Sequence, residues 1–448
     1  MKVVDKLVIN GNDISYKKSL VNGKQLESIV ISGEQYVYPD YFLSFNYYAE
    51  TEEGTVTGLG ESIRTDLVIP SKVYQGDSLY EITSINNDSF RECSSLTSIK
   101  IPDHITSIRS NAFYGCSNLT SITIGKNVQS LGSHALTCYN LTEIYYNATN
   151  CPDFTSYNYA LMDAGKNGAG ITVTIGANVE RIPARLFHPS DNNQDMSPKI
   201  TAVIFEEGSV CKRIGSWAFD WCKNLTSIEI PGSVEYIGQA AFGGCAGLTS
   251  LVLGKGVEFI DRSAFSGCSS LTSVEIPGSV TLIDDYAFYD CSSLTSVVLE
   301  NGIPGIRSNV FQNCNSLTSI EIPDSVTSIG EYAFENCSSL TSIEIPDSVT
   351  SIGDCAFRGC SGLLSFIIPA QITRIKEWTF YECTALKSVI IPSSVTLIED
   401  YAFYDCSSLR TITFAGTMEE WNRVKKVNRW RDGVPATKVV CSDGEEDL

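Results

Sequence analysis

Cysteine recurs in this chain at a fixed interval, and that interval limits the folds open to it more than any other feature. In the second half a cysteine occupies every 23rd position, giving Cys222, Cys245, Cys268, Cys291, Cys314, Cys337, Cys360, Cys383 and Cys406. Cys93 and Cys116 are also 23 residues apart, and Cys138 follows one position short of a full step. A constant step held over eight intervals predicts a repeat array rather than a series of unrelated domains.

One repeat, LTSIEIPDSVTSIGEYAFENCSS at residues 317–339, indicates what each unit forms. Ile320-Glu321-Ile322 alternates like a half-buried strand, and Pro323 ends it because proline cannot donate to a ladder. Residues 326–329 are a second short extended or turn segment, and residues 331–336 are long enough for about one helical turn. The apolar positions expected to face inward are Leu317, Ile320, Ile322, Val326, Ile329, Ala333, Phe334 and Cys337.

A single repeat cannot bury these side chains, whereas stacked repeats can, with each strand pairing to the next at about 4.8 Å. We therefore expect a β-solenoid, a β-rich fold of the α/β class. Its coils, each of about 23 residues, should form a curved, right-handed stack with one parallel sheet and short helical turns.

The places where the period fails predict the domain boundaries. We expect an N-terminal β cap at residues 1–65, the solenoid at 66–416 and a C-terminal cap at 417–448. Two insertions are expected near residues 146–169 and 188–199. In the C-terminal cap, residues 416–430 are predicted to form an amphipathic helix before a last strand at 439–442.

The consensus LTSIxIPxSVTSIGxxAFxxCSS resembles the leucine-rich repeat of the BspA-like surface proteins of bacteria. Residues 271–408 match it closely, and weaker matches extend to about 66–416. The closing GT-x-x-x-W-x-x-V segment is also similar to the ends of family members. The resemblance implies the leucine-rich-repeat fold, display at the cell surface or secretion, and adhesion to host proteins or other microbes. The N-terminal sequence MKVVDKLVINGND shows no apolar leader segment, so this localisation implies a leader that is not present in the sequence.

Charge and motif content exclude several classes of protein. The net charge is −20 with a pI of about 4.6, which argues against a nucleic-acid partner, since phosphate binding requires clustered Lys and Arg. No apolar run is long enough for a transmembrane segment. Only His104, His134 and His188 are available, and no nucleophile–base pair or zinc motif is visible. We therefore expect no catalytic residues, no metal and no cofactor.

The cysteines allow two interpretations. Those at the repeat position are expected to be buried free thiols, acting as small apolar residues. Stacked cysteines have parallel Cβ vectors, which fit disulfide geometry poorly. The better disulfide candidates are the irregular Cys138, Cys151, Cys211, Cys355 and Cys441.

The residue between the two strand isoleucines is the first candidate for ligand binding, because it should point outward. Beside it lie rows of serine and threonine. One interpretation is an acidic, hydroxyl-rich face with an apolar patch that suits a basic protein; the other is ordinary strand residues in register, with charges for solubility. The candidate residues are Glu229, Val252, Glu275, Val298, Glu321, Glu344, Ile367 and Ile390.

A second candidate is a stripe of aromatic residues at two repeat positions three residues apart, and so on the same side of one helical turn. Exposed rings could stack on sugars, whereas the simpler interpretation is packing between coils. The stripe consists of Trp217, Tyr286, Tyr289, Tyr332, Trp378, Tyr381, Tyr401 and Tyr404.

Together these patterns predict a non-enzymatic cell-surface or secreted binding protein, used in adhesion, whose partner is a host extracellular or bacterial-surface protein. The alternatives are a carbohydrate-binding module that uses the aromatic stripe, and a passive surface-layer spacer.

Overall fold

The computed structural model forms two compact units, and each is described separately. Unit 1 comprises residues 1–179, 186–200 and 206–208, and unit 2 comprises residues 180–185, 201–205 and 209–448. The described residues are 53–59, 66–67, 69–75, 78–155, 159–189 and 194–448, together with the strands before residue 53. Residues 156–158 and 190–193, within the two expected insertions, and the segments between the strands of the expected N-terminal cap lie outside the described residues.

Unit 1 begins with antiparallel strands. Four of them form one sheet: β1 (Leu7–Ile9), β2 (Asn12–Val21), β3 (Lys24–Ile31) and β4 (Glu34–Val37). β5 (Leu43–Tyr48) pairs with β6 (Glu53–Leu59), and β8 (Lys72–Gln75) pairs with β9 (Ser78–Ile85). β6 runs parallel to β9, so the antiparallel strands lead directly into parallel coils.

The coils of unit 1 pair in parallel through two sets of strands. The longer strands are β7 (Asp66–Leu67), β10 (Ser98–Lys100), β12 (Ser121–Ile124), β14 (Glu143–Tyr146) and β15 (Ile171–Ile175). The second set continues from β9 through β11 (Ser107–Ile108) to β13 (Ser130–Leu131). Outside the strands, a short 3-10 helix lies at Gln194–Met196.

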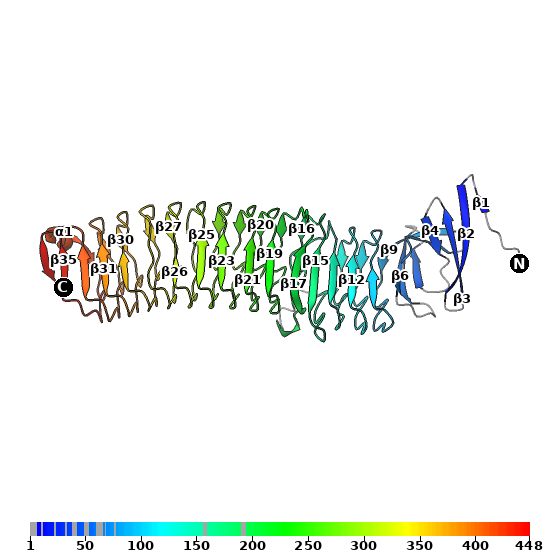
Figure 1. Cartoon of the computed structure of the whole chain (residues 1–448), viewed down its shortest axis with the longest axis horizontal. Helices are drawn as coiled ribbons and strands as arrows, with labels where there is room; N and C mark the ends of the chain where they lie inside the picture. Colours follow the sequence, from blue (N-terminus) through cyan, green and yellow to red (C-terminus); the bar gives the residue numbers. More distant parts are fainter. Residues whose placement is uncertain are drawn as a thin grey trace. The chain divides into compact units, whose positions relative to one another are not determined.

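Unit 2 repeats the same arrangement over more coils, and its longer strands lie side by side in Figure 1. They are β17 (Ile200–Phe205, in unit 2 from Thr201), β19 (Ser227–Ile230), β21 (Ser250–Leu253), β23 (Ser273–Ile276), β25 (Ser296–Leu299), β26 (Ser319–Ile320), β29 (Ser365–Ile367), β31 (Ser388–Ile391), β33 (Thr411–Phe414) and β35 (Lys438–Cys441). β36 (Gly444–Asp447) closes the unit by pairing antiparallel with β35.

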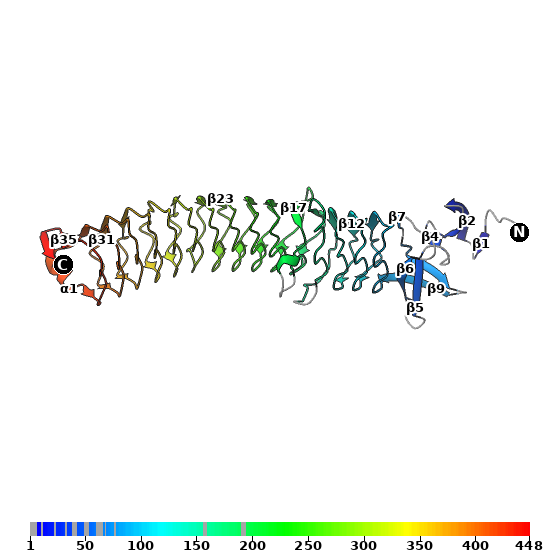
Figure 2. The ribbon, with the colours of Figure 1, turned by 90° about the horizontal axis from the view of Figure 1, so that it is seen from below.

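A second parallel ladder of two-residue strands runs through unit 2, along a different side of the coils (Figure 2). It consists of β16 (Arg181–Ile182), β18 (Arg213–Ile214), β20 (Tyr236–Ile237), β22 (Phe259–Ile260), β24 (Leu282–Ile283), β27 (Ser328–Ile329), β28 (Ser351–Ile352), β30 (Arg374–Ile375), β32 (Leu397–Ile398) and β34 (Lys425–Lys426). The β-solenoid of stacked coils of about 23 residues is therefore confirmed, but each coil has two parallel ladders and not one.

The expected helical turns are wrong. Residues 331–336 form overlapping turns, in which Tyr332 and Asn336 have φ of 56° and 59°. A helix has no residues in this left-handed region. The amides of Tyr332, Phe334 and Asn336 instead donate to carbonyl oxygens of the next coil, on Asp354, Ala356 and Arg358. Stacking of the coils therefore determines this turn.

The amphipathic helix expected at residues 416–430 forms over only part of that range. α1 (Met418–Arg423) is the one α-helix in the described residues. Thr417 caps it, accepting from the amide of Glu420 while the Glu420 side chain accepts from Thr417. The helix ends because Val424 is extended and Lys425–Lys426 pair with β32. No helix in the described residues is long and apolar enough to cross a membrane.

The core of unit 2 is a row of stacked phenylalanine rings, one from each coil. Neighbouring ring centroids lie 5.1 to 5.9 Å apart, and each ring is buried. The rings belong to Phe219, Phe242, Phe265, Phe288, Phe311, Phe334, Phe357, Phe380 and Phe403. Unit 1 has the same contact between Phe90 and Phe113, at 5.1 Å.

None of the sixteen cysteines, all of which lie in the described residues, forms a disulfide, and all except the half-buried Cys93 are buried. The expected burial is confirmed, and the irregular cysteines that were the better disulfide candidates are free thiols. The ladder thiols also donate hydrogen bonds: Cys337 Sγ lies 3.3 Å from the carbonyl oxygen of Phe311, and the same contact recurs from coil to coil. Burial raises the pKa of the Cys291 thiol to about 12. The ladder thiols are thus protonated polar groups with a partner, and not only apolar filler.

Candidate binding surfaces

The longer strands of unit 2 expose every second residue, because the residues on either side face the core. In β19, Ile228 and Ile230 are buried and Glu229 between them is exposed. The same alternation applies to the eight predicted residues, which are all exposed. We call this set the outward ladder: Glu229, Val252, Glu275, Val298, Glu321, Glu344, Ile367 and Ile390.

Parallel register brings these residues together in pairs. Glu229 lies opposite Val252, and Glu275 lies opposite Val298. Glu321 bridges to Glu344, and Ile367 lies opposite Ile390. The apolar members are well exposed, at 51% for Val252 and 64% for Ile367. Each pair therefore combines an acidic and an apolar residue, two acids or two apolar residues.

The carboxylates of the Glu321–Glu344 pair have no ion-pair partner among the described residues of unit 2. Beside Glu321 there is a surface hollow of about 530 Å³. Leu299, Ile322 and Pro323 supply its apolar lining, and Glu300, Glu321, Asp324 and Asn301 its polar lining. Glu300 also accepts a hydrogen bond from the amide of Gly278, at 2.7 Å. The hollow can therefore accept a cationic or hydrogen-bond-donating group.

The sequence pattern missed three exposed apolar residues on or beside this face: Ile204, Leu364 and Val440. Ile204 and Val440 lie in coils with the sequences TAVIF and KVVC, which depart from the consensus. Pairing places Val440 opposite Thr413, which in turn lies opposite Ile390. Leu364 occupies the repeat position of threonine. Alignment of strand register, and not of consensus letters, would have identified them.

The threonine row supports the structural interpretation. The hydroxyl of Thr249 donates to the carbonyl oxygen of Thr226 at 3.0 Å, and Thr295 donates to Thr272 at 2.9 Å. Thr318 and Thr341 continue the series. These hydroxyl protons join neighbouring coils, so the glutamate and aliphatic side chains are the better candidates for ligand contact.

The aromatic stripe does not form one continuous surface. Its members at the first position have φ between 52° and 62°: Trp217, Tyr286, Tyr332, Trp378 and Tyr401. The prediction that these rings share one face of a helical turn is wrong. Rings at the two positions are nevertheless in contact: Tyr286 with Tyr289 and Tyr401 with Tyr404, with ring centroids 5.7 and 5.5 Å apart. Trp378, Tyr381, Tyr401 and Tyr404 come together in two adjacent coils.

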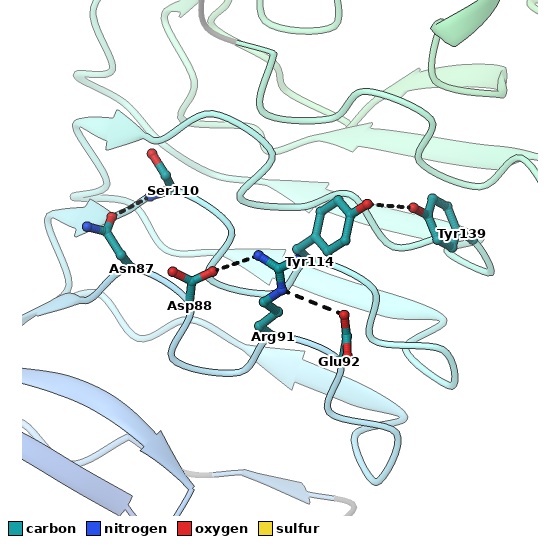
Figure 3. Close-up of polar contacts among 7 residues, drawn as sticks. All are labelled: Asn87, Asp88, Arg91, Glu92, Ser110, Tyr114 and Tyr139. Atoms are coloured by element: carbon teal, nitrogen blue, oxygen red, sulfur yellow. Dashed lines mark hydrogen bonds and ion pairs between the residues drawn. The ribbon is translucent and has the colours of Figure 1, made fainter.

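Several rings on these turns are covered by cations from the preceding coil. Arg185 lies over Trp217 at 4.5 Å, and Arg262 lies over Tyr286 at 5.1 Å. In unit 1 Arg91 lies over Tyr114 at 4.9 Å and pairs with Asp88 and Glu92 (Figure 3). These cation–π contacts stabilise the turn face.

Tyr139, also in unit 1, forms a hydrogen bond through its hydroxyl and a cation–π contact through its ring. Its hydroxyl donates to that of Tyr114 at 3.1 Å (Figure 3), which with burial raises its pKa to about 12. Lys166 lies over its ring at 4.6 Å. Within the described residues, no group of three or more His, Cys, Asp or Glu could hold a metal ion.

Comparison with solved structures found bacterial leucine-rich-repeat proteins. A leucine-rich cell surface protein from Faecalibacterium prausnitzii is 27% identical, over 86% of this chain and 96% of that one, with a TM-score of 0.39. A leucine-rich-repeat protein from Bacteroides ovatus is 24% identical, over 89% and 98%, with a TM-score of 0.45. The pneumococcal vaccine antigen PcpA is 16% identical, over 95% and 98%, with a TM-score of 0.42.

No curated protein matched the chain. The model of the BspA-type leucine-rich-repeat region matched six copies, at residues 72–194, 212–339 and 304–424. These matches cover more than half of the sequence and include the repeats that form the outward ladder. The chain therefore belongs to the BspA-type leucine-rich-repeat family.

Proposed function

We propose that this chain is a non-enzymatic binding or adhesion protein of the bacterial cell surface or its surroundings, which binds a protein partner through the outward ladder of unit 2. Leucine-rich-repeat proteins are generally non-enzymatic binding scaffolds, and the family suggests a binding or adhesion role. The main support is the outward ladder itself, which combines exposed aliphatic residues with carboxylates.

The exposed aliphatic residues of the ladder would contribute hydrophobic free energy to the binding of a partner. Val298 is 50% exposed, and Ile367 and Ile390 lie opposite each other in solvent. Full burial of one such side chain stabilises a complex by about 1.5–3 kcal/mol, so partial burial of several gives a sizeable favourable contribution. A partner that covers them would remove this apolar area from water.

The carboxylates determine which partner fits. Glu321 and Glu344 lie on neighbouring coils, and their like charges repel. A basic side chain placed between them, or in the hollow beside Glu321, would relieve that repulsion. Electrostatic complementarity of this kind mainly raises the association rate and the selectivity, and salt weakens it. The favoured partner therefore has basic and apolar side chains on one surface.

The test begins with capture of partners from host extracellular-matrix and bacterial-surface extracts, at low and high salt. For a captured protein, the double variant Glu321→Gln/Glu344→Gln should slow association several-fold and flatten its salt dependence. The matched control Glu258→Gln/Glu331→Gln removes the same charge from exposed residues outside the longer strands and should have little effect.

Two results would overturn the proposal. Equal effects of the two double variants would mean that net charge, and not the outward ladder, governs association. The absence of any specific partner at either salt concentration would favour a passive surface spacer.

A further inference from the structure

We propose that the turn segments at the C-terminal end of unit 2 form a binding site for a neutral polysaccharide, separate from the outward ladder. The site consists of Trp378, Tyr381, Tyr401, Tyr404 and Arg429, which we call the C-terminal aromatic cluster. It lies on turns and not on strands, so it does not depend on the function proposed above.

The cluster follows from the repeat. Trp378 and Tyr401 occupy the same turn position in successive coils, with ring centroids 6.0 Å apart. The amide of Phe403 donates to Trp430, as the amide of Phe380 donates to Ala402, so Arg429 occupies that turn position in the next coil. Trp378, Tyr401 and Arg429 therefore form a row. Coils about 4.8 Å apart match the length of one sugar ring, so each coil can contact one sugar unit.

The tyrosines at the second position support this row from the side. Tyr381 and Tyr404 stack in parallel, with centroids 5.1 Å apart and planes 6° from parallel. Arg358 lies over the Tyr381 ring at 5.3 Å and is held by an ion pair with Glu335 at 3.2 Å. Tyr404 contacts Tyr401 edge to face. Because these rings are occupied by one another and by Arg358, they fix the position of Tyr401.

Trp378 differs from Trp217 and Tyr286, the two rings at its turn position that a cation covers. It is 36% exposed, and no cation lies over it among the described residues. In the coil before Tyr286, Ser263 occupies the same turn position as this tyrosine. Arg262, which covers the Tyr286 ring, comes directly before Ser263. The corresponding residue for Trp378 is Asp354, directly before Cys355. The indole therefore keeps a surface that is open to solvent.

Packing alone does not require aromatic residues here. Ala240, Ser263 and Asn309 occupy the same position in other coils, with φ of 48°, 56° and 61°. Bulky residues are disfavoured in this left-handed region, and such outliers cluster at functional sites. Two large rings in adjacent coils, at a position that accepts alanine or serine, indicate selection for their exposed surface.

The chemistry favours a neutral sugar. The C–H face of a pyranose packs on an indole or phenol ring, and its hydroxyls need donors and acceptors nearby. Arg429 uses one of its N–H groups on the Tyr401 hydroxyl, at 3.2 Å, and keeps others for sugar oxygens. Glu377 and Glu382, both exposed and next to cluster residues in the chain, can accept from hydroxyls. These carboxylates, on a chain of net charge −20, would repel an acidic polysaccharide.

The test is native affinity electrophoresis of the full chain in gels that contain a soluble β-glucan, a xylan, a mannan or an α-glucan, with polygalacturonate as the acidic probe. We expect at least one neutral polymer to retard the protein. Trp378→Asn should weaken that binding at least tenfold, because asparagine keeps the turn geometry that Asn309 shows and removes the ring. Trp217→Asn, at the equivalent but cation-covered position, is the matched control and should bind normally.

Each other result overturns the proposal. Lack of retardation by every neutral polymer, or equal weakening by both variants, would remove the site. Retardation by polygalacturonate alone, abolished by Arg429→Ala, would show a simple cationic contact. Loss of a protein partner in Trp378→Asn without any sugar binding would assign the cluster to protein recognition. Circular dichroism of each variant excludes misfolding, and Tyr401→Asn gives a second test if Trp378→Asn does not fold.

Discussion

The two units of the chain share one kind of core and differ on their surfaces. Phe90 and Phe113 stack in unit 1 as Phe311 and Phe334 do in unit 2. Among the residues of unit 1 from 79 onward whose side chains are described, however, Tyr145 is the one large apolar residue that is exposed. The exposed large apolar residues of unit 2 are Ile204, Val210, Val252, Phe259, Val298, Leu364, Ile367, Trp378, Ile390 and Val440.

The difference separates two roles within the same repeat. Buried positions must stay alike because each side chain packs on its equivalent in the next coil. Outward positions have no such constraint, so they can vary without disturbing the core. The comparison of the units therefore directs the search for a partner to unit 2, whose outward positions combine aliphatic side chains with carboxylates.

The largest expected effect tests the shared core. Phe334→Ala in unit 2 and Phe113→Ala in unit 1 should each cost about 3–5 kcal/mol, through lost contacts and a cavity. Because contacts in a solenoid reach mainly to adjacent coils, hydrogen exchange should rise near the changed residue, within about residues 300–370 for Phe334→Ala. Unchanged exchange in that range would contradict the stacked core.

The second prediction concerns alkaline pH. Burial raises the pKa of ladder thiols in unit 2, to about 12 for Cys291 and well above the ordinary value for Cys314 and Cys337. A folded-state pKa above the unfolded one gives stability that is complete below about pH 9 and is lost as pH rises. Each such thiol lowers the free energy of unfolding by about 1.4 kcal/mol per pH unit in that range.

This loss should be concentrated in unit 2, because in unit 1 the pKa of Cys116 is lowered while that of Cys138 is raised. All five tryptophans, at 217, 221, 378, 421 and 430, lie in unit 2, so their fluorescence during urea unfolding at pH 7, 9 and 10 reports on it. Cys291, Cys314, Cys337 and Cys360 should react with thiol reagents only after unfolding. A urea midpoint that does not fall between pH 9 and 10, or fast labelling of the native protein, would contradict the buried ladder.

The repeat predicted what depends on residues within one coil. Alternation around Glu321 gave the strand and its exposed residue, and the constant step gave the register of one coil against the next. The turn at residues 331–336 was predicted as helical because its composition permits a helix and no glycine marks the left-handed positions. Its amides find partners in the following coil, a contact that local sequence does not reveal.

The same limit applies to the candidate surfaces. Spacing alone placed Trp217 and Trp378 in one stripe. In the structure Arg185 lies over the Trp217 ring, whereas no cation lies over Trp378 among the described residues. Which rings are covered depends on side chains in the preceding coil. Likewise, Lys425–Lys426 could not be predicted as a strand, because two residues acquire strand geometry only by pairing with β32.

The smallest expected effect tests the repulsion on which the proposed basic partner depends. Like charges directly opposite in a sheet destabilise it by ~0.2–1 kcal/mol, and exposure to water places the Glu321–Glu344 bridge near the lower end. Glu321→Gln should therefore stabilise unit 2 slightly at low salt, and the gain should disappear at high salt as screening removes the repulsion.

Glu229→Gln is the matched control, because Glu229 lies opposite Val252 and not opposite a second acid. Urea unfolding followed by tryptophan fluorescence measures both variants. An equal gain in the two would mean that the net charge of −20, and not the paired carboxylates, is relieved, and a basic partner would then have no particular reason to bind at Glu321.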